Sequence, residues 1–455
     1  MYDPHRSGRR TGTHHGTWKG DVRLNVRLSP ASLCGTVHSI ASKSDVHRLL
    51  FCAAQADGPV TIEMNDRSPL SDDILTTAEV IRGLGADVRE EPGRFTVTPS
   101  NVTPKAPTFD CRESGSTLRF LLPVAAARCD ESSFNGSGRL PDRPVGELLD
   151  VLKARGVEVS ADRLPFSFQG RLQSGTFELP GNVSSQYITG LLLALPALDG
   201  DSEIRLTTPL QSASYVNITL HALSRFGIRT SVLPRGFLVP GGQPFRSPGT
   251  ILADGDWSNA GYFFAAGALG KDPVSVSGLS PDSPQGDKVL AGILKERMGA
   301  PVSKVRQEDG TCTYTVTPAE TLSACDLDVH DIPDAFPVLA VLAAFAKGRT
   351  RFTGCERLRF KESDRIASVI AMLEALGGKA MEDGSDIIVC GADETGGLTG
   401  GTVQSCGDHR IVMAAAVAAL RCTGDVTVTG AEAVRKSYPS FFDEYTALGG
   451  IAHVI

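Results

Sequence analysis

Positively charged side chains are concentrated in short segments of the chain that also carry helix-capping residues. Lys43 and Arg48 belong to such a segment, which runs directly into the apolar stretch 49–54. A serine at the start of a helix caps its free amide groups, and the positive end of the helix dipole favours anions. Arg48 follows Ser44 by four residues, so both lie on one helix face. The segment predicts a phosphate or carboxylate site, and the alternative is an ordinary capped helix with solvated charges.

Four further segments repeat this design, in which small or polar residues precede an apolar helix. They are residues 114–117, 181–186, 256–260 and 407–410. Gly115 would let a ligand approach the backbone closely. Ser184, Ser185 and Gln186 add two hydroxyls and an amide. If folding brings these helix starts together, they form a site for a polyanion.

The densest mixture of acidic and basic residues lies at 356–365. Lys361 and Arg365 are four residues apart, which predicts that they project from one face of a helix. Glu362 follows Lys361, and upstream Asp334 begins a second apolar helix. Two carboxylates among cations suit proton transfer beside an anionic substrate, although a charge run of this kind taken alone also fits a solvated helix face.

Composition limits the function classes. The chain has 455 residues, with 45 Lys and Arg against 52 Asp and Glu, for a net charge of -7. This balance argues against bulk electrostatic binding to nucleic acid or to an anionic membrane, so any basic site is local. Arg143 and Lys436, in loops next to prolines, are further local cations. No apolar run reaches the roughly 20 residues of a membrane span. The ten cysteines form no C-x-x-C pair, so we expect reduced thiols in a cytoplasmic protein.

An internal repeat sets the expected architecture. Six times, a helical pattern runs into a glycine and then into a short alternation of apolar and polar residues, at a spacing of about 72 residues. The glycines are Gly85, Gly156, Gly227, Gly299, Gly377 and Gly449. Each is expected to end a helix in the left-handed conformation and to lead into a strand. We predict an α/β protein of repeated α+β units in two groups of three, after a disordered N-terminal extension over residues 1–20.

The motifs resemble the EPSP synthase family of enolpyruvyl transferases over nearly the whole chain from about residue 21. The matching segments, in the family's order, are SKSDVHR, ESGSTLRFL, LPDRPVG, NVSSQYITGLLLA, IPDAF, RLRFKESDR and GDHRIVMA. The resemblance implies an inside-out α/β barrel fold of two globular domains, each of three βαβαββ units. It places residues 42–254 in one domain and residues 21–41 with 255–455 in the other, with the active site in the cleft between them.

The resemblance also implies a reaction. Members transfer the enolpyruvyl group of phosphoenolpyruvate to the 5-hydroxyl of shikimate 3-phosphate and release phosphate, on the shikimate pathway to chorismate and aromatic amino acids. No metal and no organic cofactor is expected. The expected partners are the two small anionic substrates, with no nucleic acid and no membrane, and the expected state is a cytoplasmic monomer.

Site residues are implied position by position. The catalytic set would be Asp334, Glu362 and Lys43. Shikimate 3-phosphate would be held by Lys43, Ser44, Arg48, Ser184, Ser185, Gln186, Ser212, Asp334 and Lys361. Phosphoenolpyruvate would be held by Lys43, Gly115, Arg143, Gln186, Arg365, Arg410 and Lys436.

Some positions depart from the family's pattern. Glu113 stands where many members carry Asn, and Arg357 where some carry Asn or Ser, so neither is included in the predicted site. Ile40 and Ala41 replace a common Pro-Gly pair. Gly115 keeps the small residue that in the family is associated with access for the inhibitor glyphosate.

Three other functions fit parts of this pattern. The related transferase that acts on UDP-N-acetylglucosamine has Lys-Asn where this chain has Lys43-Ser44, and a reactive loop cysteine that is missing near Arg143. A binding or scaffold protein on the same fold would need no paired carboxylates among its cations. Nucleic-acid end processing on a related three-repeat unit is disfavoured by the six-unit length and by the lack of a broad basic surface.

Overall fold

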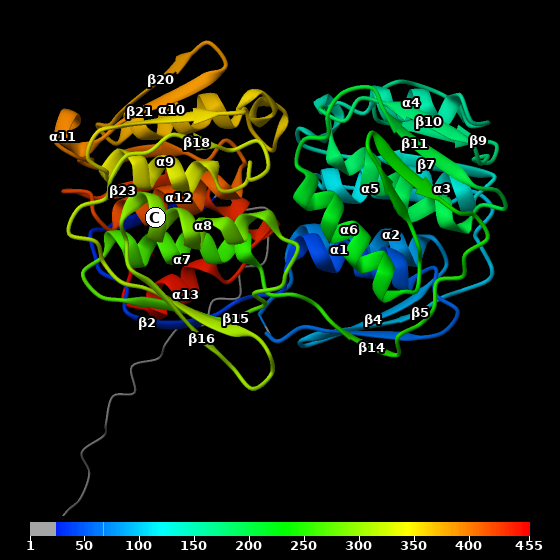
Figure 1. Cartoon of the computed structure of the whole chain (residues 1–455), viewed down its shortest axis with the longest axis horizontal. Helices are drawn as coiled ribbons and strands as arrows, with labels where there is room; N and C mark the ends of the chain where they lie inside the picture. The colour runs from blue at the N-terminus through cyan, green and yellow to red at the C-terminus, as the bar shows by residue number, and fades with distance from the viewer. Residues whose placement is uncertain (1–23, 67) are drawn as a thin grey trace, which may run out of the picture.

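The computed structural model describes residues 24–66 and 68–455. The predicted disordered extension over residues 1–20 lies outside the described residues. Within them, the strands form six four-stranded sheets, and each sheet joins a parallel pair of strands to two antiparallel strands. Figure 1 shows the sheets and helices gathered into two globular bodies, as predicted for the fold class.

The first domain contains three of these sheets, in the orders β14-β3-β5-β4, β6-β7-β9-β8 and β10-β11-β13-β12. Its strands are β3 (Val60–Glu63), β4 (Asp87–Glu91), β5 (Arg94–Thr98), β6 (Thr108–Asp110), β7 (Glu131–Asn135), β8 (Glu158–Val159), β9 (Phe166–Gln169), β10 (Thr176–Leu179), β11 (Ser202–Leu206), β12 (Ser231–Leu233), β13 (Gly236–Val239) and β14 (Thr250–Leu252). Its helices are α1 (Lys43–Ala53), α2 (Asp72–Gly83), α3 (Gly115–Arg128), α4 (Gly146–Lys153), α5 (Ser185–Ala194) and α6 (Ala213–Arg225).

The second domain contains the sheets β16-β17-β15-β2, β18-β19-β21-β20 and β22-β23-β1-β24. Its strands are β1 (Asn25–Ser29), β2 (Gly35–His38), β15 (Val274–Leu279), β16 (Val302–Arg306), β17 (Cys312–Val316), β18 (Leu327–Asp328), β19 (Arg349–Thr353), β20 (Lys379–Asp383), β21 (Asp386–Cys390), β22 (Gly401–Gln404), β23 (Val426–Thr429) and β24 (Ile451–Val454). Its helices are α7 (Trp257–Leu269), α8 (Val289–Gly292), α9 (Phe336–Phe345), α10 (Arg365–Ala375), α11 (Ala392–Thr395), α12 (His409–Ala419) and α13 (Phe441–Ala447).

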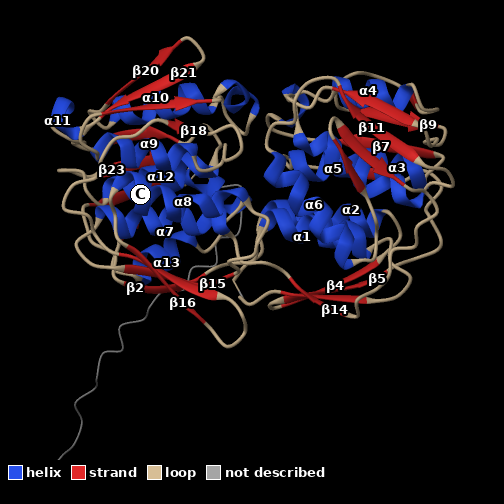
Figure 2. Ribbon diagram, viewed as in Figure 1, coloured by secondary structure: helices blue, strands red, loops and turns tan. Residues whose placement is uncertain are grey.

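Apolar helices form the centre of each domain, and the sheets lie outside them (Figure 2). Every residue of α9 is buried, which is what a helix that is apolar on all sides requires. Every residue of α12 is buried too, including His409 and Arg410 in its first turn. The buried side chains divide into two cores. One core contains side chains from Ala41 to Ala253. The other core contains side chains from Val26 to Ile40 and from Trp257 to Leu448. This division supports the predicted domain boundaries, which stay a prediction.

The chain crosses between the domains twice, and the two crossings run side by side. Ala41 pairs with Gly255, and Ser42 donates its amide to the carbonyl of Asp254 at 2.7 Å. The amide of Asp256, the residue after Gly255, donates to the carbonyl of Ile40 at 2.9 Å. Helices α1 and α7 therefore begin next to one another at the junction of the domains.

The six repeat glycines have the conformation that the sequence predicts. All six have positive φ, between 76° at Gly227 and 104° at Gly449. Five of them follow an α-helix within a few residues, and each precedes the outermost antiparallel strand of its sheet. Gly299 differs, because the helical stretch before it ends in a π-helical segment, Ile293–Met298.

The prediction that Lys361 and Arg365 share one helix face is wrong. Residues 356–360 form a short 3₁₀-helix, and α10 begins only at Arg365. Asp364 caps α10 by accepting a hydrogen bond from the amide of Ala367, and its backbone is extended. An N-cap residue cannot be helical itself, so the capping aspartate separates the two cations.

No helix in the described part of the chain is both long enough and apolar enough to cross a membrane.

Candidate active site

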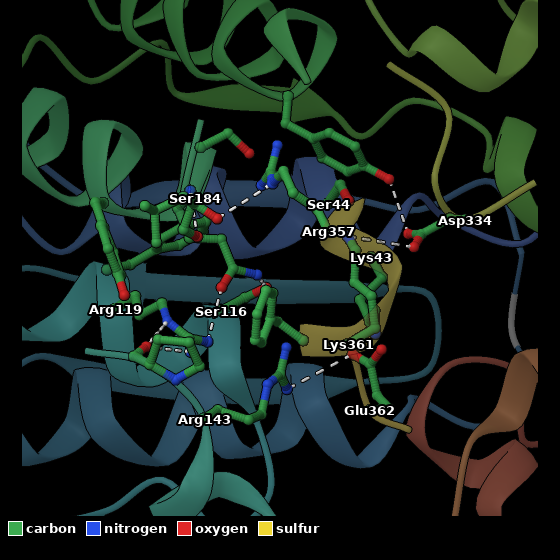
Figure 3. Close-up of a pocket in the computed structure, with 18 of the residues that line it drawn as sticks. Lys43, Ser44, Ser116, Arg119, Arg143, Ser184, Asp334, Arg357, Lys361 and Glu362 are labelled. Carbon is green, nitrogen blue, oxygen red and sulfur yellow. Dashed lines mark hydrogen bonds and ion pairs between the residues drawn. The ribbon is translucent and has the colours of Figure 1, made fainter. Parts of the chain in front are cut away.

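A cleft between the domains collects side chains from both of them (Figure 3). It contains about 790 Å³ of space, part of which is open to solvent. The first domain contributes Lys43, Ser44, Arg48, Ser116, Arg119, Phe120, Arg143, Pro144, Val183, Ser184, Ser185, Gln186, Tyr187 and Tyr215. The second domain contributes Asp334, Arg357, Phe360, Lys361 and Glu362.

Three helices of the first domain begin at this cleft. Serines 42, 114 and 184 cap α1, α3 and α5, and each accepts a hydrogen bond from an amide in the first turn. Polar residues from all three first turns line the cleft: Lys43 and Ser44, Ser116, and Ser185 and Gln186. The prediction that these helix starts converge is therefore confirmed for three of the five segments within one cleft. Converging helix N-termini favour negative charge.

A buried arginine organises the carboxylates of the second domain. Arg365 is 1% exposed, and each of its three nitrogens meets a different carboxylate. Nη1 lies 2.5 Å from Asp334 Oδ1, Nη2 lies 2.7 Å from Glu362 Oε2, and Nε lies 2.9 Å from Asp408 Oδ2. Asp334 and Glu362 are thus held side by side by one rigid guanidinium fork.

Both of these carboxylates are held ionised. Burial alone would raise the pKa of Asp334, but the charges of Lys361, Arg410 and Arg365 outweigh it and hold the pKa well below its ordinary value. Burial is likewise outweighed at Glu362, where Arg365 and then Arg143 lower the pKa well below its ordinary value. Asp334 also accepts a hydrogen bond from the Tyr215 hydroxyl at 2.8 Å, which links it to the first domain.

Three cations differ in how they are engaged. Lys361 Nζ lies 3.8 Å from Asp334 Oδ1, and burial lowers its pKa to about 8, against the raising effect of Asp334. Lys43 Nζ lies 2.8 Å from Asp73 Oδ2 in the first domain. Arg143 Nη1 lies 3.8 Å from Glu362 Oε1 across the cleft, and its buried Nε has no hydrogen-bond partner among the described residues.

The structure brings most of the predicted site residues into the cleft. Ten of the fifteen line it: Lys43, Ser44, Arg48, Arg143, Ser184, Ser185, Gln186, Asp334, Lys361 and Glu362. Arg48 is almost fully buried there, and its nitrogens donate to oxygens of Ser44, Thr189, Tyr215 and Thr219. Its predicted contact with a phosphate stays a prediction.

The other five predicted residues lie around this cleft. Gly115 packs against two arginines, because a Cβ there would lie 2.5 Å from Arg119 Nη1 and 2.7 Å from Arg143 Nη1. Ser212 has φ 56°, and its hydroxyl bonds to the carbonyl of His330. Arg410 lines a smaller adjoining cavity with Asp256 and Asp287. Arg365 pairs with Asp334, Glu362 and Asp408, and Lys436 Nζ pairs with Glu113 Oε2 at 2.8 Å.

Sequence reasoning missed several residues that line the cleft. Arg119 follows Gly115 by one helical turn, so its spacing was a usable signal. It donates to Gln186 Oε1 at 3.0 Å, while Gln186 Nε2 donates to Ser116 Oγ at 2.9 Å, so the amide is fixed from both sides. Tyr215 had no local signal, because it reaches the site only through the packing of α6. Arg357 is not among the predicted site residues, because some family members carry Asn or Ser at this position, yet it lines the cleft.

No group of three or more His, Cys, Asp or Glu side chains that could hold a metal ion is found in residues 24–66 and 68–455. The arrangement offers cations and helix termini for anionic ligands, together with two ionised carboxylates for proton transfer.

Comparison with known proteins identifies the family. The family model for EPSP synthase (3-phosphoshikimate 1-carboxyvinyltransferase) matches residues 29–445. The chain belongs to the EPSP synthase family. A relative from Clostridium kluyveri, named 3-phosphoshikimate 1-carboxyvinyltransferase, is 38% identical over 429 residues, covering 93% of this chain and 97% of the relative. A relative of the same name from Methanocorpusculum labreanum is 38% identical over 432 residues, covering 94% of this chain and 99% of the relative.

Solved structures show the same fold. EPSP synthase from Acinetobacter baumannii superposes with a TM-score of 0.79 at 24% identity, covering 95% of this chain and 100% of that chain. The enolpyruvyl transferase NikO from Streptomyces tendae gives a TM-score of 0.75 at 20% identity, covering 95% of this chain and 99% of that one. These likenesses confirm the predicted two-domain EPSP synthase fold. The acceptor must be argued from the site itself.

Proposed function

We propose that this chain is a 3-phosphoshikimate 1-carboxyvinyltransferase, which transfers the enolpyruvyl group of phosphoenolpyruvate to the 5-hydroxyl of shikimate 3-phosphate and releases phosphate. The family and its named relatives support this reaction. The observation that carries the chemistry is the double pairing of Arg365 with Asp334 and Glu362 at the face of a cleft rich in cations. A binding protein would have no need for two ionised carboxylates beside its anion site.

The reaction needs proton transfers at two atoms, the oxygen of the 5-hydroxyl and C3 of phosphoenolpyruvate. In the first stage the acceptor hydroxyl loses its proton and its oxygen bonds to C2 of phosphoenolpyruvate, while C3 gains a proton and becomes a methyl group. In the second stage the methyl group loses a proton, the double bond re-forms, and the bond from C2 to the phosphate oxygen breaks. Two separate acid–base groups near the donor carbon serve both stages.

We assign these proton transfers to the two paired carboxylates. Asp334 acts at the 5-hydroxyl, where Lys361 and Tyr215 hold its carboxylate in place. Glu362 is the acid–base group at C3: once it is protonated it gives its proton to C3 in the first stage, and as a carboxylate it takes a proton back from the methyl group in the second stage. Its carboxylate lies between Arg365 and Arg143, on the side of the cleft where the donor is expected. Lys43, at the start of α1, assists the departing phosphate.

Substrate binding divides between two groups of residues. For shikimate 3-phosphate we propose Lys43, Ser44, Arg48, Ser184, Ser185, Gln186, Ser212, Asp334 and Lys361. For phosphoenolpyruvate we propose Lys43, Gly115, Arg143, Gln186, Arg365, Arg410 and Lys436. Residues of both groups come from both domains, so binding of the substrates favours closure of the cleft.

We further propose a monomer in the cytoplasm, divided into domains at residues 41/42 and 254/255. The ten cysteines all carry free thiols, which suits a reducing compartment. Light scattering on a size-exclusion column tests the oligomeric state.

Phosphate release is the direct test of the proposed function. The protein is mixed with both substrates, and each substrate is then omitted in turn. We expect release only with both present. Release with a UDP-sugar acceptor in place of shikimate 3-phosphate would assign the chain to the sister transferase, and no release with either acceptor would indicate a binding protein.

A further inference from the structure

Arg357 reaches from the second domain into the first. It belongs to the 3₁₀-helix 356–360 of the second domain, yet both of its hydrogen-bond partners belong to the first domain. Nε donates to the carbonyl of Val183 at 3.1 Å, and Nη1 donates to the Ser212 hydroxyl at 2.9 Å. Figure 3 shows its guanidinium directed toward Ser184. The side chain therefore spans the cleft.

The charge of Arg357 has no carboxylate partner. In the described part of the chain, no Asp or Glu oxygen lies within the 4.0 Å of an ion pair with it, whereas Arg365 and Arg410 both meet carboxylates. Burial lowers the pKa of Arg357, with only distant charges opposing it. Arg357 is partly buried, and a partly buried cation without a counter-ion carries a desolvation cost that an anionic ligand offsets.

Two other arginines of the cleft lack a carboxylate partner, but each of their nitrogens has a hydrogen-bond partner. All three nitrogens of Arg48 bond to hydroxyl or carbonyl oxygens. The same holds for Arg119, whose partners are Pro144, Gly115 and Gln186. Arg357 differs, because its Nη2 has no hydrogen bond among the described residues and is not buried away from solvent. This NH₂ group can bind a ligand without breaking an existing bond.

The two contacts of Arg357 flank two helix starts. Val183 precedes Ser184, the cap of α5, and Ser212 precedes α6. Ser184 and Ser185 line the same cleft beside Arg357. Hydroxyl donors, a helix N-terminus and a guanidinium fork in one place are suited to a phosphate monoester, which carries two charges and three acceptor oxygens. Arg143, on the donor side, is instead paired with Glu362.

We propose that Arg357 binds the 3-phosphate of the acceptor and thereby distinguishes shikimate 3-phosphate from unphosphorylated shikimate. The inference rests on the proposed function and adds to it a residue that the family resemblance did not supply. Because Arg357 belongs to the second domain and the serines to the first, the acceptor phosphate bonds to both domains. Its binding strengthens the closed cleft.

The test compares R357Q with the wild type by calorimetric titration with shikimate 3-phosphate and, separately, with shikimate. Loss of a charged hydrogen-bond donor to phosphate should raise the Kd for shikimate 3-phosphate by about 10- to 100-fold. The Kd for shikimate should stay about the same. R357K, which keeps the charge but loses the planar fork, should fall between the two.

A second readout follows the phosphate itself. Arg357 stabilises the dianion, so the second pKa of the bound phosphate, followed by ³¹P NMR, should be higher in R357Q than in the wild type. A purely structural role for Arg357 would not move this titration. Thermal melting of each variant establishes that it is folded.

Arg359 provides a matched control on the same short helix. It pairs with Asp364 and Glu382 and does not line the cleft. R359Q should bind shikimate 3-phosphate as the wild type does. Equal weakening of both ligands in R357Q, or an unchanged ³¹P titration, would overturn the proposal and leave Arg357 as an inter-domain contact. Failure of the wild type to bind shikimate 3-phosphate would instead refute the proposed function.

Discussion

Lys436 Nζ lies 2.8 Å from Glu113 Oε2, and this ion pair joins the second domain to the first domain. Glu113 precedes Gly115 by two residues. The same ammonium donates to the carbonyl of Gly407 at 2.8 Å. Lys436 is expected to contact phosphoenolpyruvate, so the carboxylate of Glu113 and the anionic donor compete for one cation.

Replacing Glu113 with Gln should therefore improve donor binding. The Glu113 side chain is 42% exposed, so the pair is a partly solvated one worth at most about 1 kcal/mol. We expect the KM for phosphoenolpyruvate to fall by about 2- to 5-fold, measured by steady-state kinetics at low salt. Glu131→Gln, at an exposed glutamate of β7, is the control. A higher KM in E113Q would show that the pair is needed to assemble the site.

Arg143→Ala should separate the two substrates. Its side chain is 8% exposed and its nearest carboxylate is 3.8 Å away, so its N–H groups remain available to bind phosphoenolpyruvate. We expect the KM for phosphoenolpyruvate to rise by about tenfold or more, with the calorimetric Kd for shikimate 3-phosphate nearly unchanged. Arg163→Ala, at an exposed arginine of the same domain, controls for loss of charge. Equal loss of both substrates would contradict this division.

Glu362→Gln should slow turnover while leaving the binding of shikimate 3-phosphate intact. The amide has nearly the shape of the carboxylate but cannot accept and return a proton, so we expect kcat to fall by about 10²-fold or more. Exchange of solvent deuterium into the C3 methylene of phosphoenolpyruvate, followed by NMR, should fall with it. Glu356→Gln, at an exposed residue of the neighbouring turn, should have little effect. A normal exchange rate in E362Q would remove Glu362 from the proton transfer.

The activity should fall at alkaline pH because of Lys361. Burial lowers the pKa of Lys361 from 10.5 to about 8, so the ammonium is charged below about pH 8 and neutral above it. Its charge holds Asp334 ionised and is expected to bind the acceptor's ring hydroxyls. We expect kcat/KM for shikimate 3-phosphate to fall about tenfold for each pH unit above about 8. Lys361→Arg should lose this alkaline limb, since arginine stays charged. The same limb in both proteins would assign the titration to another group.

Gly190→Ala should destabilise the first domain. A Cβ at Gly190 of α5 would lie 2.2 Å from the carbonyl oxygen of Arg119 on α3, a contact that neither backbone can relieve without moving. We expect the free energy of unfolding to fall by about 1–3 kcal/mol, measured by denaturant titration. Gly292→Ala is the matched control in a helix, because a Cβ there meets nothing within 4 Å. Equal stability of the two variants would show that α3 and α5 can separate freely.

Local patterns in the sequence were enough to predict the building blocks of this fold. The six repeat glycines, from Gly85 to Gly449, all have the left-handed backbone that the sequence predicts. The helix starts at Ser42, Ser114 and Ser184 are capped as their residue types indicate. These features depend on contacts within a few residues, which the sequence displays directly.

Residue types also predicted the chemistry of the site, although not how each group is engaged. The sequence contains the carboxylates Asp334 and Glu362 and the cations around them, and the structure places them at one cleft. It does not reveal that Arg365 pairs with both, or that each nitrogen of Arg48 has a hydrogen-bond partner inside the first domain. The expected helix face shared by Lys361 and Arg365 was wrong because Asp364 caps a new helix between them.

Only the tertiary structure decided which distant groups meet. Arg357 reaches Val183, 174 residues away, and Tyr215 reaches Asp334, 119 residues away. Such pairs form because two cores, each built from three repeats, place the ends of their helices at a common cleft. A hydrogen bond depends on positions within a few tenths of an ångström. Those positions result from the packing of whole domains, which no short segment of the sequence encodes.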